Sequence, residues 1–311
     1  MRPAWYICAY LTFIFLGGAL IAPWLYKLCQ AAASALPAFE FLARQPFHRY
    51  VHRSFMAMGA LGLWPFLRSV GFRSWRGFGL GGHRHAVHQT AQGLLLGFAS
   101  VFCAALAVLA VRGRTWSSGH SGNVIAGHLL KATLAAVIVA FIEELFFRGA
   151  IFGALRRGMP WRAALLISSA LYAILHFFER PPAPANVDWI AGLVSFAQML
   201  RGFTEMDRLM PAFFTLLLAG CILAIGYQRT GALYFSLGLH AGWIFSIKSY
   251  GFFTREQSNA NARLWGSGNL LDGWLALVVL LLVLAVVLKW PAWCPARSMS
   301  QPEPVSSAPH G

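Results

Sequence analysis

The sequence predicts an all-α polytopic membrane protein with about eight transmembrane helices. Hydrophobic residues make up 58% of the 311-residue chain and charged residues 11%, whereas soluble domains are about 45–50% apolar and about 25% charged. Apolar runs of about the length that crosses a bilayer recur along the chain, at 5–26, 55–70, 94–111, 126–147, 161–178, 211–227, 231–248 and 271–290.

Each run predicts one helix, and four segments need separate justification. The run at 5–26 exceeds the roughly 7–15 apolar residues of a signal peptide, so we expect a retained helix. The runs at 55–70 and 231–248 are short or polar for a membrane span. The segment 189–200 predicts a ninth helix that lies in the membrane interface or re-enters the bilayer.

The net charge of +15 indicates anionic lipids rather than nucleic acid as the partner. Basic residues such as Arg44, Arg73 and Arg156 are spread over several loops between the apolar runs. Lipid headgroups are the counter-charge that such loops meet. Lys and Arg divide about evenly between alternate loops, so they do not orient the chain in the membrane. The sequence carries no signal for the oligomeric state.

Composition divides the chain into four parts. Residues 1–122 predict supporting helices joined by basic loops, and residues 123–248 predict a helix core that holds the candidate site, because polar groups accumulate there within apolar runs. Residues 249–290 predict a loop and a last transmembrane helix, and the Pro- and Ser-rich segment 291–311 a flexible tail. The histidines of the Gly-rich loop 79–88 lie among basic residues, where we expect headgroup contact rather than a metal site; they are His83, His85 and His88.

Two adjacent carboxylates, Glu143 and Glu144, lie in an apolar stretch that is long enough to cross a bilayer. An ionised carboxylate at mid-membrane depth costs about 2.5–3.5 kcal/mol, so each needs a partner or a task. On a helix Glu144 and Arg148 share a face at spacing i, i+4, while Glu143 is turned about 100° away. We therefore expect Glu144 to be paired with Arg148 and Glu143 to be free for chemistry.

Two further helices bring histidines into the apolar zone, His176 on the fifth run and His240 on the seventh. Buried ionisable groups in membranes tend to face one another or a wet cavity. Glu143 with His176 and His240 could supply the base, the oxyanion stabiliser and the acid that peptide hydrolysis needs. The same three residues could instead hold a catalytic zinc ion. Sequence alone does not separate these two mechanisms.

Residues next to the histidines predict how they are supported. Tyr172 lies one turn before His176 and could orient it. Gly238 and Gly242 flank His240 and would let another backbone or a peptide substrate approach the helix closely.

These residues resemble the type II CAAX prenyl endopeptidases and their bacterial relatives, the CPBP or ABI family of intramembrane proteases. The family's Glu-Glu-x-x-x-Arg motif is complete at 143–148, and Phe-x-x-x-His occurs with Tyr172 in place of Phe. Only half of the last motif, His-x-x-x-Asn or Asp, is present, because the residue four positions after His240 is Ile244. The resemblance covers about 123–248 and implies a multi-helix endopeptidase that cleaves prenylated or small membrane-associated peptides. It implies Glu143 as the base and the two histidines as its partners. For a bacterial source it implies the inner membrane.

Other classes of protein remain as alternatives. Gly119-His120-Ser121-Gly122 matches a rhomboid serine-protease pattern, with His240 as a conceivable base, but it lies in a polar loop. A non-enzymatic membrane protein, such as a transporter, an assembly or immunity factor or a catalytically inactive relative, could use the Glu, His and Arg groups as a structural network. A protease requires these groups around one cavity. A transporter would extend them along a path to both faces.

Overall fold

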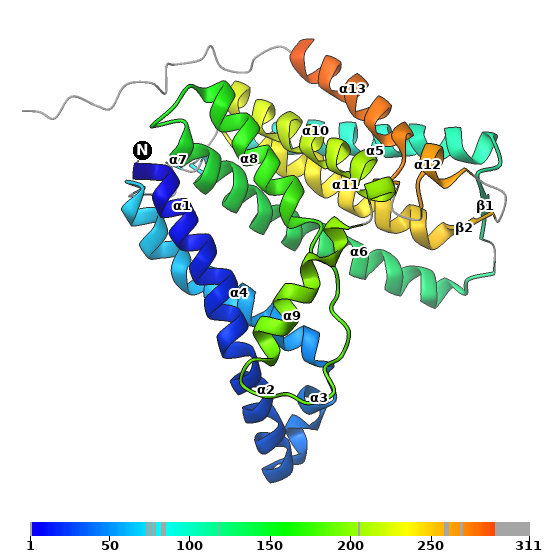
Figure 1. Cartoon of the computed structure of the whole chain (residues 1–311). Coiled ribbons are helices and arrows are strands. Elements are labelled where there is room, and N and C mark those ends of the chain that lie inside the picture. The colour runs from blue at the N-terminus through cyan, green and yellow to red at the C-terminus, as the bar shows by residue number, and fades with distance from the viewer. Residues whose placement is uncertain are drawn as a thin grey trace, which may run out of the picture.

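The structure, a computed structural model, describes residues 2–289 except 73, 75, 76, 78, 82–84, 118, 205, 258–260, 268 and 269. The described residues are mostly helical, as predicted (Figure 1). The predicted tail 291–311 and His83 of the histidine loop lie outside the described residues.

An N-terminal arm extends from the main bundle in Figure 1. It begins with α1 (Arg2–Thr12), the π-helix η1 (Phe13–Gly17) and α2 (Gly18–Ala35), which run on as one helix. The short helices η2 (Pro37–Phe39) and α3 (Glu40–Ala43) turn the chain into α4 (Phe47–Ser69), which packs back along α1 and α2. Buried residues recur every three or four positions along the first helix, at Ile7, Tyr10, Ile14 and Gly18. This spacing places one apolar stripe against α4.

The main bundle contains the remaining long helices, and Figure 1 shows them side by side. They are α5 (Ala86–Ala110), α6 (Gly122–Glu143) with the π-helix η4 (Glu144–Phe152) and α7 (Gly153–Leu155), α8 (Trp161–Leu175), α10 (Met206–Thr230), α11 (Tyr234–Phe253) and α13 (Trp274–Lys289). The short helix α12 (Ala262–Trp265) precedes α13. Because α6 runs directly into η4, the two carboxylates lie inside a helix rather than at a loop.

The predicted ninth helix is present. It comprises α9 (Ala191–Met199) and the 3-10 helix η5 (Leu200–Phe203), and it packs against α2 and α4 of the arm. The two helices together are only about 21 Å long and cannot cross a bilayer. At Gly192 a Cβ would lie 1.9 Å from the carbonyl oxygen of Ala19, so glycine is required where α9 meets α2.

Helices α5 and α11 run in the same direction and touch through their glycines. A Cβ at Gly93 would lie 2.2 Å from the Phe235 carbonyl oxygen, and one at Gly238 would lie 2.1 Å from that of Thr90. Gly97 and Gly242 make the next contact along the pair. The backbone that approaches Gly238 and Gly242 is therefore that of α5, which resolves the two alternatives that the sequence left open.

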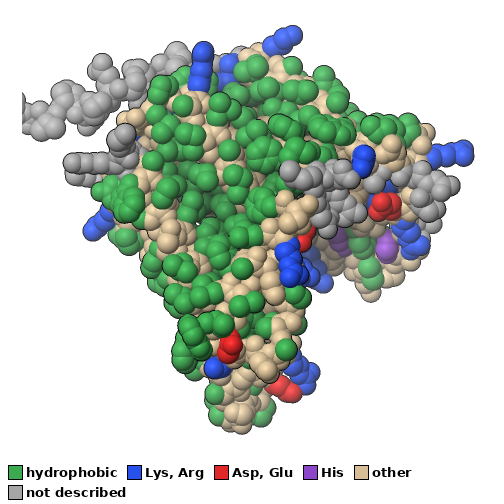
Figure 2. All heavy atoms as spheres, in the orientation of Figure 1, with side chains coloured by type: hydrophobic (Ala, Val, Ile, Leu, Met, Phe, Trp, Pro, Cys, Tyr) green, Lys and Arg blue, Asp and Glu red, His purple; other side chains and the backbone are tan. Residues whose placement is uncertain are grey.

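The structure does not confirm eight membrane-spanning helices. A helix covers most of each predicted run, but four helices among the described residues are long and apolar enough to cross a membrane, namely 4–35, 86–110, 122–155 and 209–230. Helices α8 and α13 are apolar but shorter than these. Helix α4 carries Arg49, Arg53 and Arg68 within its length, which lowers its hydropathy. Figure 2 shows hydrophobic side chains over most of one face of the molecule, with charged side chains mostly along its edges, as in an integral membrane protein.

A small sheet was not predicted. Strand β1 (Arg114–Trp116), after α5, pairs antiparallel with β2 (Thr254–Glu256), after α11. The Arg114 guanidinium donates to the hydroxyl and the carbonyl of Thr254 at 2.7 and 2.9 Å. The sheet thus fastens together the C-terminal ends of the two helices that pack through glycine.

Candidate active site

Glu144 and Arg148 form the ion pair that their spacing predicts. Arg148 Nη1 lies 2.7 Å from Glu144 Oε1, and the two side chains are 1% and 0% exposed. Arg148 also donates to the Gly220 carbonyl of α10 and lies over the Tyr172 ring. The segment is a π-helix rather than the expected α-helix, a form that is rare and is often found at functional sites.

His240 of α11 also contacts Glu144. Its Nδ1 lies 2.8 Å from Glu144 Oε1. A carboxylate oxygen accepts, so His240 Nδ1 carries the proton and donates it. In the neutral ring Nε2 is then left as an acceptor. Glu144 therefore fixes both the orientation and the tautomer of His240, in addition to neutralising Arg148.

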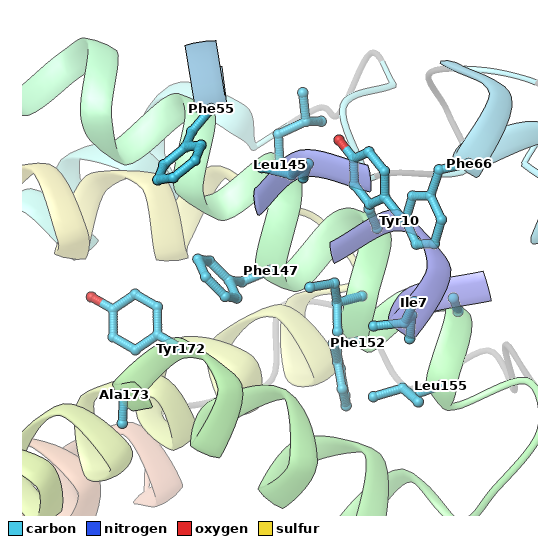
Figure 3. Close-up of a cluster of buried hydrophobic side chains, with 14 of the residues drawn as sticks. Ile7, Tyr10, Phe55, Phe66, Leu145, Phe147, Phe152, Leu155, Tyr172 and Ala173 are labelled. Carbon is cyan, nitrogen blue, oxygen red and sulfur yellow. The ribbon is translucent and has the colours of Figure 1, made fainter. Parts of the chain in front are cut away.

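A backbone carbonyl group holds His176 in the same tautomer as His240. Its Nδ1 lies 2.7 Å from the Tyr172 carbonyl oxygen, one turn earlier on α8. Because a carbonyl oxygen only accepts, Nδ1 again donates and Nε2 is the acceptor. Tyr172 thus positions His176 through its carbonyl group. Its hydroxyl instead lies 3.4 Å from Nε2 of His240, and Figure 3 shows its ring beside that of Phe147.

Glu143, His176 and His240 meet at one place. Glu143 Oε2 lies 3.8 Å from His176 Nε2 and 3.7 Å from His240 Nε2. It is buried and has no hydrogen-bond partner. These separations are too long for direct hydrogen bonds but are suited to a bridging water. The Tyr172 hydroxyl faces Nε2 of His240, so a donor or a cation at this place would chiefly serve Glu143 Oε2 and His176 Nε2.

A cavity of about 140 Å³ lies beside the two histidines. Its walls are mostly apolar, and Ile244 lies among them. Helix α5 contributes Ser100 and Val101, and the segment before α13 contributes Leu270 and Leu271. Residues outside the predicted core 123–248 therefore also line the cavity. Sequence reasoning did not find Ser100 or the α10 residue Thr215, because neither belongs to a recognisable spacing pattern.

The donor types at this place suit zinc, although the described residues hold no group of three His, Cys, Asp or Glu arranged to bind a metal. Both imidazoles present Nε2 while Nδ1 is hydrogen-bonded to an oxygen, as in zinc sites. Two ligands at about 2.0–2.1 Å from a tetrahedral zinc lie about 3.3–3.4 Å apart, so the separations of 3.7 and 3.8 Å are slightly wider than those of a closed zinc site.

The rhomboid-like pattern at 119–122 lies away from His240. His120 stacks on Phe252 near the end of α11, with ring centroids 4.2 Å apart. Twelve residues of α-helix separate Phe252 from His240, which corresponds to about 18 Å. Ser121 precedes α6, and its side chain is exposed. This loop therefore does not bring a serine nucleophile to His240.

The comparison with protein families agrees with the geometry. A family model described as type II CAAX prenyl endopeptidase, Rce1-like, matches residues 125–246. This segment is Rce1-like. The match confirms the resemblance predicted from the sequence motifs, and at the family level it supports a CAAX-type intramembrane protease. The Rce1-like segment contains all three residues that meet, together with Glu144, Arg148 and Ile244. Searches of curated proteins and of solved structures found no match.

Proposed function

We propose that the protein is an intramembrane endopeptidase in which Glu143 activates a water molecule to hydrolyse a peptide bond of a membrane-associated substrate. The observation that carries this proposal is the convergence of Glu143 Oε2 with the Nε2 atoms of His176 and His240 at 3.8 and 3.7 Å. A water at this point can donate its two protons to two of the three acceptors. A base within reach through one water satisfies the geometric requirement for general-base catalysis.

The chemistry follows from these positions. Glu143 takes a proton from the water, and the water oxygen forms a bond to the carbonyl carbon of the substrate. The proton then passes from Glu143 to the amide nitrogen, the C–N bond breaks, and an acid and an amine leave. The second proton of the water is donated to Nε2 of His176, which holds the water in line, while Nε2 of His240 faces the Tyr172 hydroxyl at 3.4 Å. Glu144 and Arg148 remain charged throughout and keep His240 oriented.

The surroundings support a substrate that is itself held in the membrane. The cavity is lined mainly by leucine, isoleucine, valine and alanine side chains, which favour an apolar segment or a lipid-modified peptide. The basic loops that connect the helices are suited to anionic lipid headgroups. For a bacterial source we infer the inner membrane. A prenylated peptide is the first substrate to try, because the family match names that class.

The experiment is cleavage of a farnesylated, fluorogenic CAAX-type peptide by the purified protein in liposomes. We expect Glu143→Gln to abolish cleavage and to leave the protein folded, because glutamine keeps the shape and removes the base. Glu40→Gln is the matched control, since Glu40 is an exposed glutamate on α3 and its change should leave the rate unaltered. Equal cleavage by the parent and Glu143→Gln would exclude Glu143 as the base, and no cleavage by the parent would favour a non-enzymatic network.

Zinc is a separate proposal with its own test. If the three side chains close around zinc, the purified protein contains about one zinc per chain by elemental analysis, and His176→Ala and His240→Ala both lose it. A metal content that is the same in these variants and in the parent would exclude zinc at this place. The cleavage assay after treatment with a chelator then shows whether any bound metal is required.

A further inference from the structure

One hydroxyl group in the cavity is unused. Thr215 of α10 is fully buried and lines the cavity with His176 and His240. Its Oγ1 has no hydrogen-bond partner. Buried polar groups are nearly always hydrogen-bonded, so an exception calls for an explanation. A ligand that enters the cavity would provide the missing partner.

Other threonines of the chain show what Thr215 does not do. The hydroxyls of Thr90, Thr230 and Thr254 each donate to the backbone carbonyl four residues earlier. For Thr215 the corresponding carbonyl is that of Pro211, and this bond is absent. The hydroxyl of Thr215 is therefore not used to support its own helix.

The remaining polar side chains of the cavity already have partners. Ser100 donates to the Gly97 carbonyl and accepts from Trp243 Nε1 at 3.0 Å. The Tyr172 hydroxyl lies against His240. Among the described residues that line the cavity, Thr215 alone offers a side-chain hydrogen-bond donor without a partner.

The cavity also lacks the polar group that the family pattern places four residues after His240. Ile244 lines the cavity at this position and has no donor. We propose that Thr215 Oγ1 donates a hydrogen bond to the carbonyl oxygen of the peptide bond that is cleaved, in place of the group that Ile244 lacks. This inference rests on the proposed endopeptidase function. When water adds to the carbonyl carbon, its oxygen becomes an oxyanion, and the bond from Thr215 strengthens while the hydroxyl keeps its proton.

The test compares Thr215→Val, which has the same shape without the hydroxyl, with Thr215→Ser, which keeps it. The assay is cleavage of the farnesylated CAAX-type peptide in liposomes, with kcat and KM measured separately. We expect Thr215→Val to lower kcat by about 10²-fold with little change in KM, as for removal of one oxyanion donor. Thr215→Ser should keep most of the rate. Thr90→Val, which removes a helical threonine hydroxyl outside the cavity, is the control and should cleave like the parent.

Two further measurements separate this role from a structural one. The Thr215 hydroxyl has no partner in the folded protein, so the valine variant should melt at the same temperature as the parent or higher. The double variant Thr215→Val, Ile244→Asn should recover part of the lost kcat, because an amide at another position that lines the cavity restores a donor. A valine variant that unfolds or melts lower would overturn the proposal, because the hydroxyl would then have a structural partner.

The outcomes also separate this proposal from the proposed function. A parent that cleaves and a Thr215→Val variant with the same kcat overturn the role of Thr215 and leave the endopeptidase standing. A parent that cleaves no faster than the background rate without protein removes the endopeptidase, and the role of Thr215 is overturned with it.

Discussion

Glu144 accepts hydrogen bonds from two buried side chains that have little access to water, those of Arg148 and His240. Its Oε1 accepts from Arg148 Nη1 at 2.7 Å and from His240 Nδ1 at 2.8 Å. Glu143, one residue earlier, has no bonded partner for its inner oxygen. The adjacent carboxylates thus differ in their contacts, although both reach the His240 imidazole, Glu144 at Nδ1 and Glu143 at Nε2.

We expect Glu144→Ala to destabilise the protein strongly. Loss of one partner of a buried ion pair leaves an uncompensated charge and typically costs about 3–5 kcal/mol. Glu40→Ala is a matched control, because Glu40 and Arg44 have the same i, i+4 spacing but are 57% and 73% exposed. An exposed pair of this kind contributes about 0–1 kcal/mol. Thermal melting in detergent measures both, and equal losses would contradict the structural role of Glu144.

How much of the site could be predicted depends on how far apart in the sequence the interacting residues are. Glu144 and Arg148 are four residues apart, so helical spacing alone predicts their pair. The meeting of Glu143 with His176 and His240 was predicted from the cost of leaving such groups alone in lipid. The bond from His240 to Glu144 was not predicted, because it depends on how α11 is rotated against η4. Thr215 was missed because it belongs to no recognisable spacing pattern.

At the level of single elements, the four glycines between α5 and α11 are the feature that fixes the position of His240. The sequence marks Gly238 and Gly242 as sites of close approach, but the identity of the approaching backbone depends on packing. The strands β1 and β2 were also not predictable, because each has three residues and they pair across 140 positions of sequence.

We expect Gly238→Ala to destabilise the α5–α11 pair. The added Cβ would lie 2.1 Å from the Thr90 carbonyl oxygen, and backbone atoms cannot move aside as a flexible side chain can. Overpacking of this kind costs about 1–3 kcal/mol or more. Gly127→Ala on α6 is the control, because nothing lies within 4 Å of its Cβ position and alanine in a helix gains about 0.5–1 kcal/mol.

The measurement is the melting temperature of both variants together with their peptide cleavage. Because His240 lies on α11 between Gly238 and Gly242, we expect Gly238→Ala to lose activity as well as stability. A Gly238→Ala variant that melts like the parent would show that the two helices do not pack as described.

On the scale of the whole molecule, the glycine contacts bear on how many helices cross the membrane. Helix α5 is long and apolar enough to be a span, whereas the composition of α11 does not qualify it by the same criteria. The two helices run in the same direction and touch along their length, and their ends are joined by β1 and β2. If α5 crosses the bilayer, α11 must therefore lie at the same depth and cross with it.

This geometry predicts on which side of the membrane three positions lie. Thr115 in β1 and Glu256 in β2 should be on one side, and Val87 at the start of α5 on the other. The 25 residues of α5 span about 37 Å, which exceeds the apolar thickness of about 30 Å.

Single-cysteine variants at these exposed positions, with the native cysteines replaced, can be labelled in sealed vesicles with a maleimide that does not cross membranes. We expect Thr115→Cys and Glu256→Cys to react from the same side and Val87→Cys to react only after the vesicles are opened, or the reverse if the vesicles are inverted. Labelling of Val87→Cys and Thr115→Cys from one side would show that α5 does not cross, and labelling of Thr115→Cys and Glu256→Cys from opposite sides would show that the strands do not pair in the membrane-bound protein.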